Sequence, residues 1–503
     1  MDILSIIPTY LSSHKDRFNT TFVCRHWRRS FLENGALWSQ LLLRKGEVYA
    51  EALLERAKGS PLDVIVDRDI PVNKLIALLS PHVQQIRYLE IAHSSWSEII
   101  KFSEINFGQL PLLRTLKITF TKKYSRFGDL LGPIIPPSNS FFSNAANLEH
   151  FIFSSERFQL LSYFLFPRLT TLTLDMPSPF DSNGQDLFNF LKASPMLRTV
   201  EMRIQGNINL PEGPQEPIVI LPNIETFSLH MICGWSVYRT AAHISCPYSK
   251  CTSLTYEISD HEVSPGLATF PSPLTSNAII CHYASSPVEE VIFGVEPVID
   301  LWVGPAVDPV IGCSLTFRFS DTGVIKFGLR VTGLCVPQAP LEEICCDAFS
   351  QASTIIRAHP LLCHVKHLHI GYQIDTPPAH QLVFMAEEVG RLFGSVGPLD
   401  GLTIYGCDLH MFLASFFGMG DLLQQPIVFP SIKELTISYP TMEVNERECM
   451  KAIVELAKSQ HEKGIPFERV TIHAVTLPTA MAEALGRWVG AVNCFEDSTM
   501  KYR

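Results

Sequence analysis

Several features that would identify a function directly are missing from this sequence of 503 residues. No run of about 18 uncharged apolar residues is present, so a membrane-spanning helix is not expected. The apolar opening "MDILSIIPTYL" is short and has no basic segment before it, which is atypical of a secretory signal. We therefore expect an intracellular protein, cytoplasmic, nuclear or both, with no membrane partner.

The cysteines do not form a disulfide framework. There are 13 of them, an odd number, scattered along the chain without a tight framework. In a chain of this length, such thiols are typical of a reducing compartment.

Positive charge is scarce. Only 18% of the residues are charged, and the formal net charge is −10. Residues 1–60 carry nine Lys or Arg against six Asp or Glu, so the rest of the chain is more acidic still. Since proteins that bind nucleic acid usually present a basic face, we expect no nucleic-acid partner.

Catalytic motifs are absent too. The sequence contains no Gly-x-Ser-x-Gly and no His-Glu-x-x-His. The stretch "GRLFGSVGPLDG" is rich in glycine, but it lacks the Gly-Lys-Ser/Thr ending of a phosphate-binding loop. We expect no catalysis by this chain and no cofactor.

Histidines are concentrated in "HPLLCHVKHLHI", which holds His359, Cys363, His364, His367 and His369. On a strand, His367 and His369 would project from the same face. Two imidazoles can bind zinc, but no third and fourth ligand is evident. We favour surface histidines over a metal site.

A second group consists of His243, Cys246, Cys251 and His261. Its spacing lacks the close pairs of a zinc finger, so we predict no metal there either.

The most regular feature of the chain is a recurring pattern: an apolar residue, two variable ones, an apolar, a variable and an apolar. Most copies begin roughly 21 to 37 residues apart, a period typical of solenoids. About twelve copies are found: "IRYLEI" at 86, "LRTLKI" at 113, "LEHFIF" at 148, "LTTLTL" at 169, "LRTVEM" at 197, "IETFSL" at 224, "VEEVIF" at 288, "LEEICC" at 341, "VKHLHI" at 365, "LDGLTI" at 399, "IKELTI" at 432 and "FERVTI" at 467.

A six-residue strand cannot bury its apolar face alone, but stacked copies can, with the segments between them as the other wall of the core. The recurring pattern therefore predicts an α/β fold. We expect a leucine-rich-repeat-like solenoid with irregular repeats, a curved sheet and helical returns. An ordinary α/β protein with similar strands is the alternative. The expected helical returns are 186–194, 351–360, 381–394, 410–418, 446–464 and 480–490.

Two parts of the chain differ from this pattern. Ahead of the first copy, we expect helices at 47–58 and 72–79 with a strand at 62–66 between them. Residues 246–333 are irregular: we expect a β insertion, or repeats with unusual returns, with a hairpin at 314–331 around Asp321-Thr322-Gly323.

The segment "TFVCRHWRRSFLENGALWSQLLL", residues 21–43, has two tryptophans in a short helical stretch. We expect Asn34-Gly35 to end the helix, so that the chain doubles back and packs Trp38 against it. The expected apolar stripe on the helix is Phe22, Val23, Trp27, Phe31 and Leu32. A unit of about 40 residues buries too little surface to be stable alone, which favours a partner or an attached domain.

This segment, with "DILSIIPTYL" at 2–11, resembles the F-box family, and in particular fungal F-box proteins with degenerate leucine-rich-repeat-like C-terminal regions. The resemblance implies binding to a Skp-type adaptor and, through it, to a cullin ubiquitin ligase. The Leu-Pro that usually opens the family's motif is not present, so residues 22–43 carry the resemblance better than 2–11. The implied adaptor contacts are Ile3, Leu4, Ile7, Pro8, Leu11, Val23, Cys24, Trp27, Leu37 and Trp38.

The repeat array would then bind a protein substrate through residues on the open face of the sheet. The candidates are Glu90, Lys117, Thr173, Glu201, His230, His369, Thr403, Tyr405, Thr436 and Thr471. The expected organisation is an F-box-like unit at 1–45, linker helices and a first strand at 46–82, repeats at 83–245, the irregular segment at 246–333 and repeats at 334–503. Two alternatives are an interaction scaffold unrelated to ubiquitination and a hydrolase within 246–333.

Overall fold

A computed structural model of the chain divides into two compact units, Met1–Glu212 and Gly213–Arg503, each described here by itself. The structure describes residues 16, 19–43, 47–66, 71–93, 110–120, 145–155, 158–177, 184–205, 208, 219–232, 240–247, 249–258, 288–298, 310–319, 324–331, 365–372, 399–406, 431–438, 446–473 and 479–495.

The first unit begins with short helices and strands in alternation. Its elements, in chain order, are helix α3 (Arg25–Glu33), 3-10 helix η2 (Gly35–Trp38), strand β1 (Gln40–Leu42), helix α4 (Glu47–Ala57), strand β2 (Leu62–Val66), helix α5 (Val72–Leu79), 3-10 helix η3 (Ser80–Gln85) and strand β3 (Ile86–His93). The expected helices at 47–58 and 72–79 and the strand at 62–66 are confirmed.

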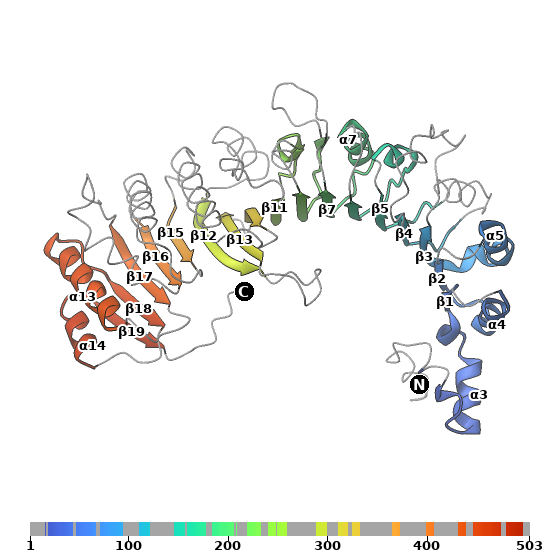
Figure 1. The fold of residues 1–503 in the computed structure, drawn as a ribbon, viewed down its shortest axis with the longest axis horizontal. Helices are drawn as coiled ribbons and strands as arrows, with labels where there is room; N and C mark the ends of the chain where they lie inside the picture. The colour runs from blue at the N-terminus through green and yellow to red at the C-terminus, as the bar shows by residue number, and fades with distance from the viewer. Residues whose placement is uncertain are drawn as a thin grey trace. The chain divides into compact units, whose positions relative to one another are not determined.

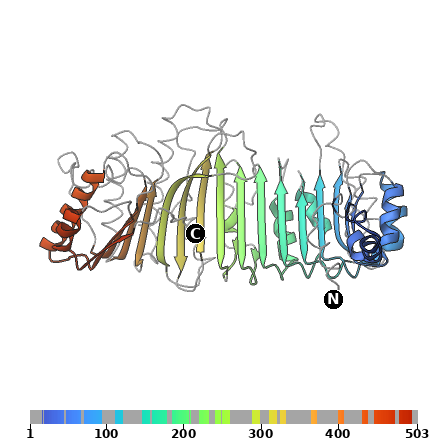
Figure 2. The same ribbon diagram turned by 90° about the horizontal axis from the view of Figure 1, so that it is seen from below.

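The same alternation continues to the end of the unit. It comprises β4 (Thr115–Phe120), β5 (His150–Ser154), 3-10 helix η4 (Phe158–Tyr163), β6 (Thr171–Met176), α7 (Gly184–Lys192) and β7 (Thr199–Gln205). Each strand from β1 to β7 pairs in parallel with the next strand in the chain. Figure 2 shows these strands side by side, and Figure 1 shows α4, α5 and α7 on one side of them.

The core lies between these strands and the segments that return from one strand to the next. Alternate strand residues are buried, as the pattern in β2 and β6 shows. Phenylalanines join the two walls: the ring of Phe151 in β5 lies 4.9 Å from that of Phe164, just after η4, and 6.0 Å from that of Phe190 in α7. The return segments therefore supply one wall of the core, as predicted.

The second unit contains both parallel and antiparallel strands. Its strands are β8 (Val219–Ile220), β9 (Thr226–Ile232), β10 (Ile244–Ser245), β11 (Cys251–Ile258), β12 (Val288–Val298), β13 (Val310–Phe319), β14 (Val324–Val331), β15 (His367–Tyr372), β16 (Leu399–Gly406), β17 (Ile432–Ser438), β18 (Arg469–His473) and β19 (Ala491–Phe495). Helix α13 (Glu446–Glu462) precedes β18, and α14 (Thr479–Gly486) precedes β19.

The hairpin expected at 314–331 is present as the antiparallel pair β13–β14. Strand β12 is also antiparallel to β13, so β12, β13 and β14 form an antiparallel group. On its two outer sides this group pairs in parallel with other strands, β14 with β11 and β12 with β15. From β15 to β19, each strand again pairs in parallel with the next.

The recurring sequence pattern corresponds to strands wherever the structure describes it. Eleven of the copies contain or overlap a strand, while "LEEICC" at 341–346 lies outside the described residues, as do the expected helices 351–360, 381–394 and 410–418. The helices expected at 186–194, 446–464 and 480–490 are confirmed as α7, α13 and α14. In the described part of the chain, no helix combines the length and apolar character needed to cross a bilayer.

Candidate functional site

Helix α3 is short and capped at both ends by local contacts. Cys24 has extended backbone dihedrals, and its Sγ accepts a 3.5 Å hydrogen bond from the backbone N–H of Trp27. At the other end, the N–H of Asn34 donates to the carbonyl oxygens of Ser30 and Phe31. The helix therefore ends at Asn34-Gly35, as the sequence predicts.

The second tryptophan holds the chain against this helix. The indole Nε1 of Trp38 donates a 2.9 Å hydrogen bond to the backbone oxygen of Phe31, and the guanidinium of Arg56 lies 5.1 Å from the indole ring centre. Leu37 and Trp38 retain only 5% and 4% exposure. These two implied adaptor contacts are packed inside this chain, where they stabilise the unit.

The expected apolar stripe is wrong for Phe22 and Val23. Because the extended Cys24 begins the helix, both residues precede α3, and each is 62% exposed. Trp27, by contrast, is half-buried and stacks on Phe31 with ring centres 5.7 Å apart. The result is an exposed apolar pair, Phe22–Val23, immediately before a short helix.

Basic residues follow this pair in the sequence. Arg25, His26 and Arg28 are exposed, and the Arg28 guanidinium lies 5.9 Å from the ring centre of Phe22 while its Nε donates to the Thr21 oxygen. Of the implied adaptor contacts, Val23, Cys24 and Trp27 are at least partly accessible. Ile3, Leu4, Ile7, Pro8 and Leu11 lie outside the described residues.

In the first unit, the candidate substrate residues occupy one row across the sheet. The register aligns Glu90, Lys117, Thr173 and Glu201 on β3, β4, β6 and β7, with Ile152 of β5 completing the row. Lys117 Nζ lies 2.9 Å from Glu90 Oε1, so these two charges neutralise each other.

Tyr88 extends this ion pair. Its hydroxyl donates a 2.8 Å hydrogen bond to Glu90 Oε2. Burial, and then the hydrogen bond to Glu90, raise the pKa of Tyr88 well above its ordinary value. At neutral pH, Tyr88 is therefore a hydrogen-bond donor fixed on the open face.

In the second unit, the candidate residues form another row. The register aligns His369, Thr403, Thr436 and Thr471 on β15, β16, β17 and β18, followed by Asn493 on β19. All are half-buried. The row carries hydroxyl, amide and imidazole groups and no carboxylate, so it can exchange hydrogen bonds with a polar ligand.

The other two candidates lie outside these rows. Tyr405 lies on β16, two residues after Thr403, in register with Gly371 and Ser438. His230 is on β9, in register with Thr255 of β11.

The histidine and cysteine groups considered for metal binding are dispersed or only partly described. His367 leans over Gly401, where an added Cβ would lie 2.7 Å from the imidazole Nδ1. His359, Cys363, His364 and His261 are outside the described residues. Across the part of the chain that is described, no three or more His, Cys, Asp or Glu side chains gather as metal ligands would.

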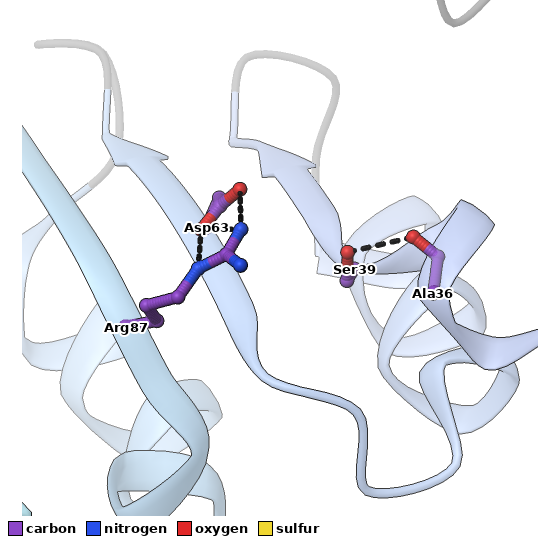
Figure 3. A network of polar contacts seen from close by, with 4 residues as sticks. All are labelled: Ala36, Ser39, Asp63 and Arg87. Atoms are coloured by element: carbon purple, nitrogen blue, oxygen red, sulfur yellow. Dashed lines mark hydrogen bonds and ion pairs between the residues drawn. The ribbon is translucent and has the colours of Figure 1, made fainter. Parts of the chain in front are cut away.

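A set of charged pairs joins neighbouring strands at their starts. The second residue of the apolar pattern is often charged, and in adjacent strands such residues pair, Arg114 with Glu149 and Asp400 with Lys433. Arg87 of the first copy pairs in the same way with Asp63 of β2, the strand ahead of the pattern. Figure 3 shows the Asp63–Arg87 pair, in which two guanidinium nitrogens donate at 2.8–3.1 Å. Each such exposed pair contributes at most about 1 kcal/mol.

Sequence reasoning missed these pairs, although the alternating charge at one position of the pattern is a readable signal. It also missed the role of Gly35. An added Cβ at Gly35 would lie 2.3 Å from the backbone oxygen of Ala57, so glycine is required there by the approach of α4. No local sequence signal shows this contact.

No protein-family model and no curated protein matches this chain. The link to the F-box family therefore rests on the residues of the opening segment.

Proposed function

We propose that this protein is the substrate-recognition subunit of an SCF-type cullin ubiquitin ligase. Its opening segment binds a Skp-type adaptor, and its sheet binds a protein substrate. The chain performs no chemistry itself; it increases the local concentration of substrate near a conjugating enzyme, which lowers the entropic part of the barrier.

The observation that carries the proposal is the exposed pair Phe22–Val23 immediately before helix α3, which Trp38 of η2 holds through Phe31. Large apolar side chains at 62% exposure, adjacent in sequence, indicate a contact surface. The hydrogen bond between Trp38 and Phe31 fixes the helix that follows this pair, so little order is lost when a partner covers the pair.

The substrate part of the proposal follows from the order of the strands. Parallel pairing in chain order, with return segments as the second wall, supports a leucine-rich-repeat-like solenoid. In such a solenoid the face without returns is free for a ligand. The hydroxyls and paired charges along this face support a polar protein segment as the ligand.

One observation favours the alternative of a scaffold outside ubiquitination. Strand β1, directly after η2, pairs in parallel with β2, so the opening segment continues the sheet. A segment attached in this way is also suited to capping the array, with no adaptor.

Co-expression of the full chain with a Skp-type adaptor and a cullin separates the two functions. Val23→Asp places a charge in the exposed pair and is expected to abolish co-purification. Leu165→Asp is the matched control, because Leu165 is 52% exposed in the same unit but distant in sequence. Failure of the wild-type chain to capture the adaptor, or equal capture by the Val23→Asp chain, would favour the scaffold.

A further inference from the structure

Strand β19 has an open edge. Within the described part of the second unit, it pairs on one side with β18, and no strand pairs with its other side. Figure 1 shows β19 at the end of the strands that start with β15. An edge of this kind offers unpaired backbone donors and acceptors to another strand.

The backbone identifies which residues point outward. The N–H of Gly490 donates to the Phe467 oxygen at 3.1 Å, so the backbone N–H and C=O groups of Gly490 point toward β18. In a parallel ladder, the N–H and C=O groups of successive residues point alternately to the two sides of the strand. Val492 and Cys494 therefore also point their N–H and C=O toward β18, while Ala491, Asn493 and Phe495 point theirs outward.

Nothing in the sequence of β19 protects this edge. Natural edge strands usually carry lysine, proline or other charged residues that discourage pairing. The earlier strand β18 starts with Arg469, which pairs back to Glu434 at 3.0 Å, but β19 offers Ala491 at that position and no charged residue anywhere. Phe495 remains 49% exposed although its ring stacks on His473.

The strand is complementary to itself. Around a two-fold axis at Asn493, antiparallel pairing would place Ala491 opposite Phe495 and Val492 opposite Cys494. A large side chain would then face a small one, with the Asn493 residues of the two copies side by side. This register also brings the outward N–H and C=O groups of 491, 493 and 495 opposite one another, as an antiparallel ladder requires.

We propose that β19 pairs with β19 of a second copy of this chain, antiparallel and centred on Asn493. The absence of charge on the strand removes like-charge repulsion between the copies. Two five-residue strands bury less than the roughly 1,200 Å² typical of stable interfaces, so the dimer forms reversibly and depends on concentration. This pairing is independent of adaptor binding, and it provides two opening segments per assembly.

Asn493 allows a selective backbone test. Because its N–H points outward, Asn493→Pro removes a donor of the edge and leaves the ladder to β18 intact. Asn493→Ala is the matched control that keeps the N–H. Sedimentation of the full chain over a hundredfold concentration range should show association in the wild type and Asn493→Ala, and only monomer in Asn493→Pro.

A cross-link tests the register even if Asn493→Pro fails to fold. In Val492→Cys, the new thiol lies opposite Cys494 of the other copy in a non-hydrogen-bonded pair, whose Cα separation of about 4.5 Å suits a disulfide. Oxidation should give a covalent dimer on a non-reducing gel, and adding Cys494→Ser should abolish it. Burial raises the pKa of the Cys494 thiol, so the oxidation is carried out at pH ~9.

Three results would overturn the proposal: a wild type that is monomeric throughout, association that survives Asn493→Pro, or a cross-link that does not need Cys494. A monomeric wild type is also the result expected if residues 496–503 or an unrelated protein's strand cover the edge instead. None of these results bears on adaptor binding, because the opening segment is unchanged in every variant.

Discussion

The indole Nε1 of Trp38 donates a 2.9 Å hydrogen bond to the backbone oxygen of Phe31. This bond ties the last turn of α3 to the segment that leads into the sheet. Because the ring of Phe31 is fully buried and stacks on Trp27, the position of α3 depends on these three aromatic residues.

Replacing Trp38 should release α3. For Trp38→Ala we expect a loss of about 3–5 kcal/mol in local stability, since a buried indole is replaced by a cavity. Trp38→Phe keeps most of the packing but loses the hydrogen bond, so we expect a loss of about 1 kcal/mol in local stability. Hydrogen exchange of the α3 amides measures both effects, and equal protection in Trp38→Ala and the wild type would refute them.

Gly35 is expected to tolerate no side chain. In Gly35→Ala the new Cβ would overlap the Ala57 oxygen, which belongs to a helix and cannot rotate away. We expect a destabilisation of about 1–3 kcal/mol. Gly486→Ala is the control, because an added Cβ there meets no atom within 4 Å. If denaturant unfolding gives the two variants the same midpoint, the close approach is not as described.

The titration of Tyr88 should make the stability of the folded chain fall as the pH rises through the alkaline range. Burial raises the pKa of Tyr88 in the folded chain above its ordinary value of about 10. Its contribution to stability is therefore complete below pH ~10 and is lost as pH rises toward the folded-state pKa. Urea midpoints should fall more steeply above pH ~10 in the wild type than in Tyr88→Phe; parallel curves would contradict this.

Gly401 and His367 should show strong coupling. Gly401→Ala would place its Cβ 2.7 Å from the imidazole Nδ1 of His367, so we expect destabilisation by roughly 1 kcal/mol. In a His367→Ala background, the same substitution should become neutral or slightly stabilising. A double-mutant cycle of unfolding free energies measures the coupling, and additive effects would show that the imidazole does not lie over the glycine.

The strands could be predicted because their pattern is local. In "LTTLTL", Leu172 and Leu174 alternate with polar residues, and this alternation alone indicates a half-buried strand. β6 contains both, fully buried. The strand begins two residues after the pattern does, because Leu169 is buried in the turn that precedes it.

Features that depend on distant residues were not predictable in the same way. Whether Phe22 joins α3 depends on the extended backbone of Cys24, and helical spacing alone cannot show this. Strand β19 was missed because "AVNCF" lacks the full pattern, and its strand geometry depends on pairing with β18. The rows of candidate substrate residues follow from the pattern, but their contacts, such as Lys117–Glu90, require the register between strands.

The most direct measurement of the central claim is a titration of the purified full chain with a purified Skp-type adaptor. We predict saturable binding whose affinity Val23→Asp weakens at least tenfold, about 1.4 kcal/mol, while Leu165→Asp leaves the affinity unchanged. Absence of binding by a folded wild-type chain, or the same affinity for Val23→Asp, would contradict it.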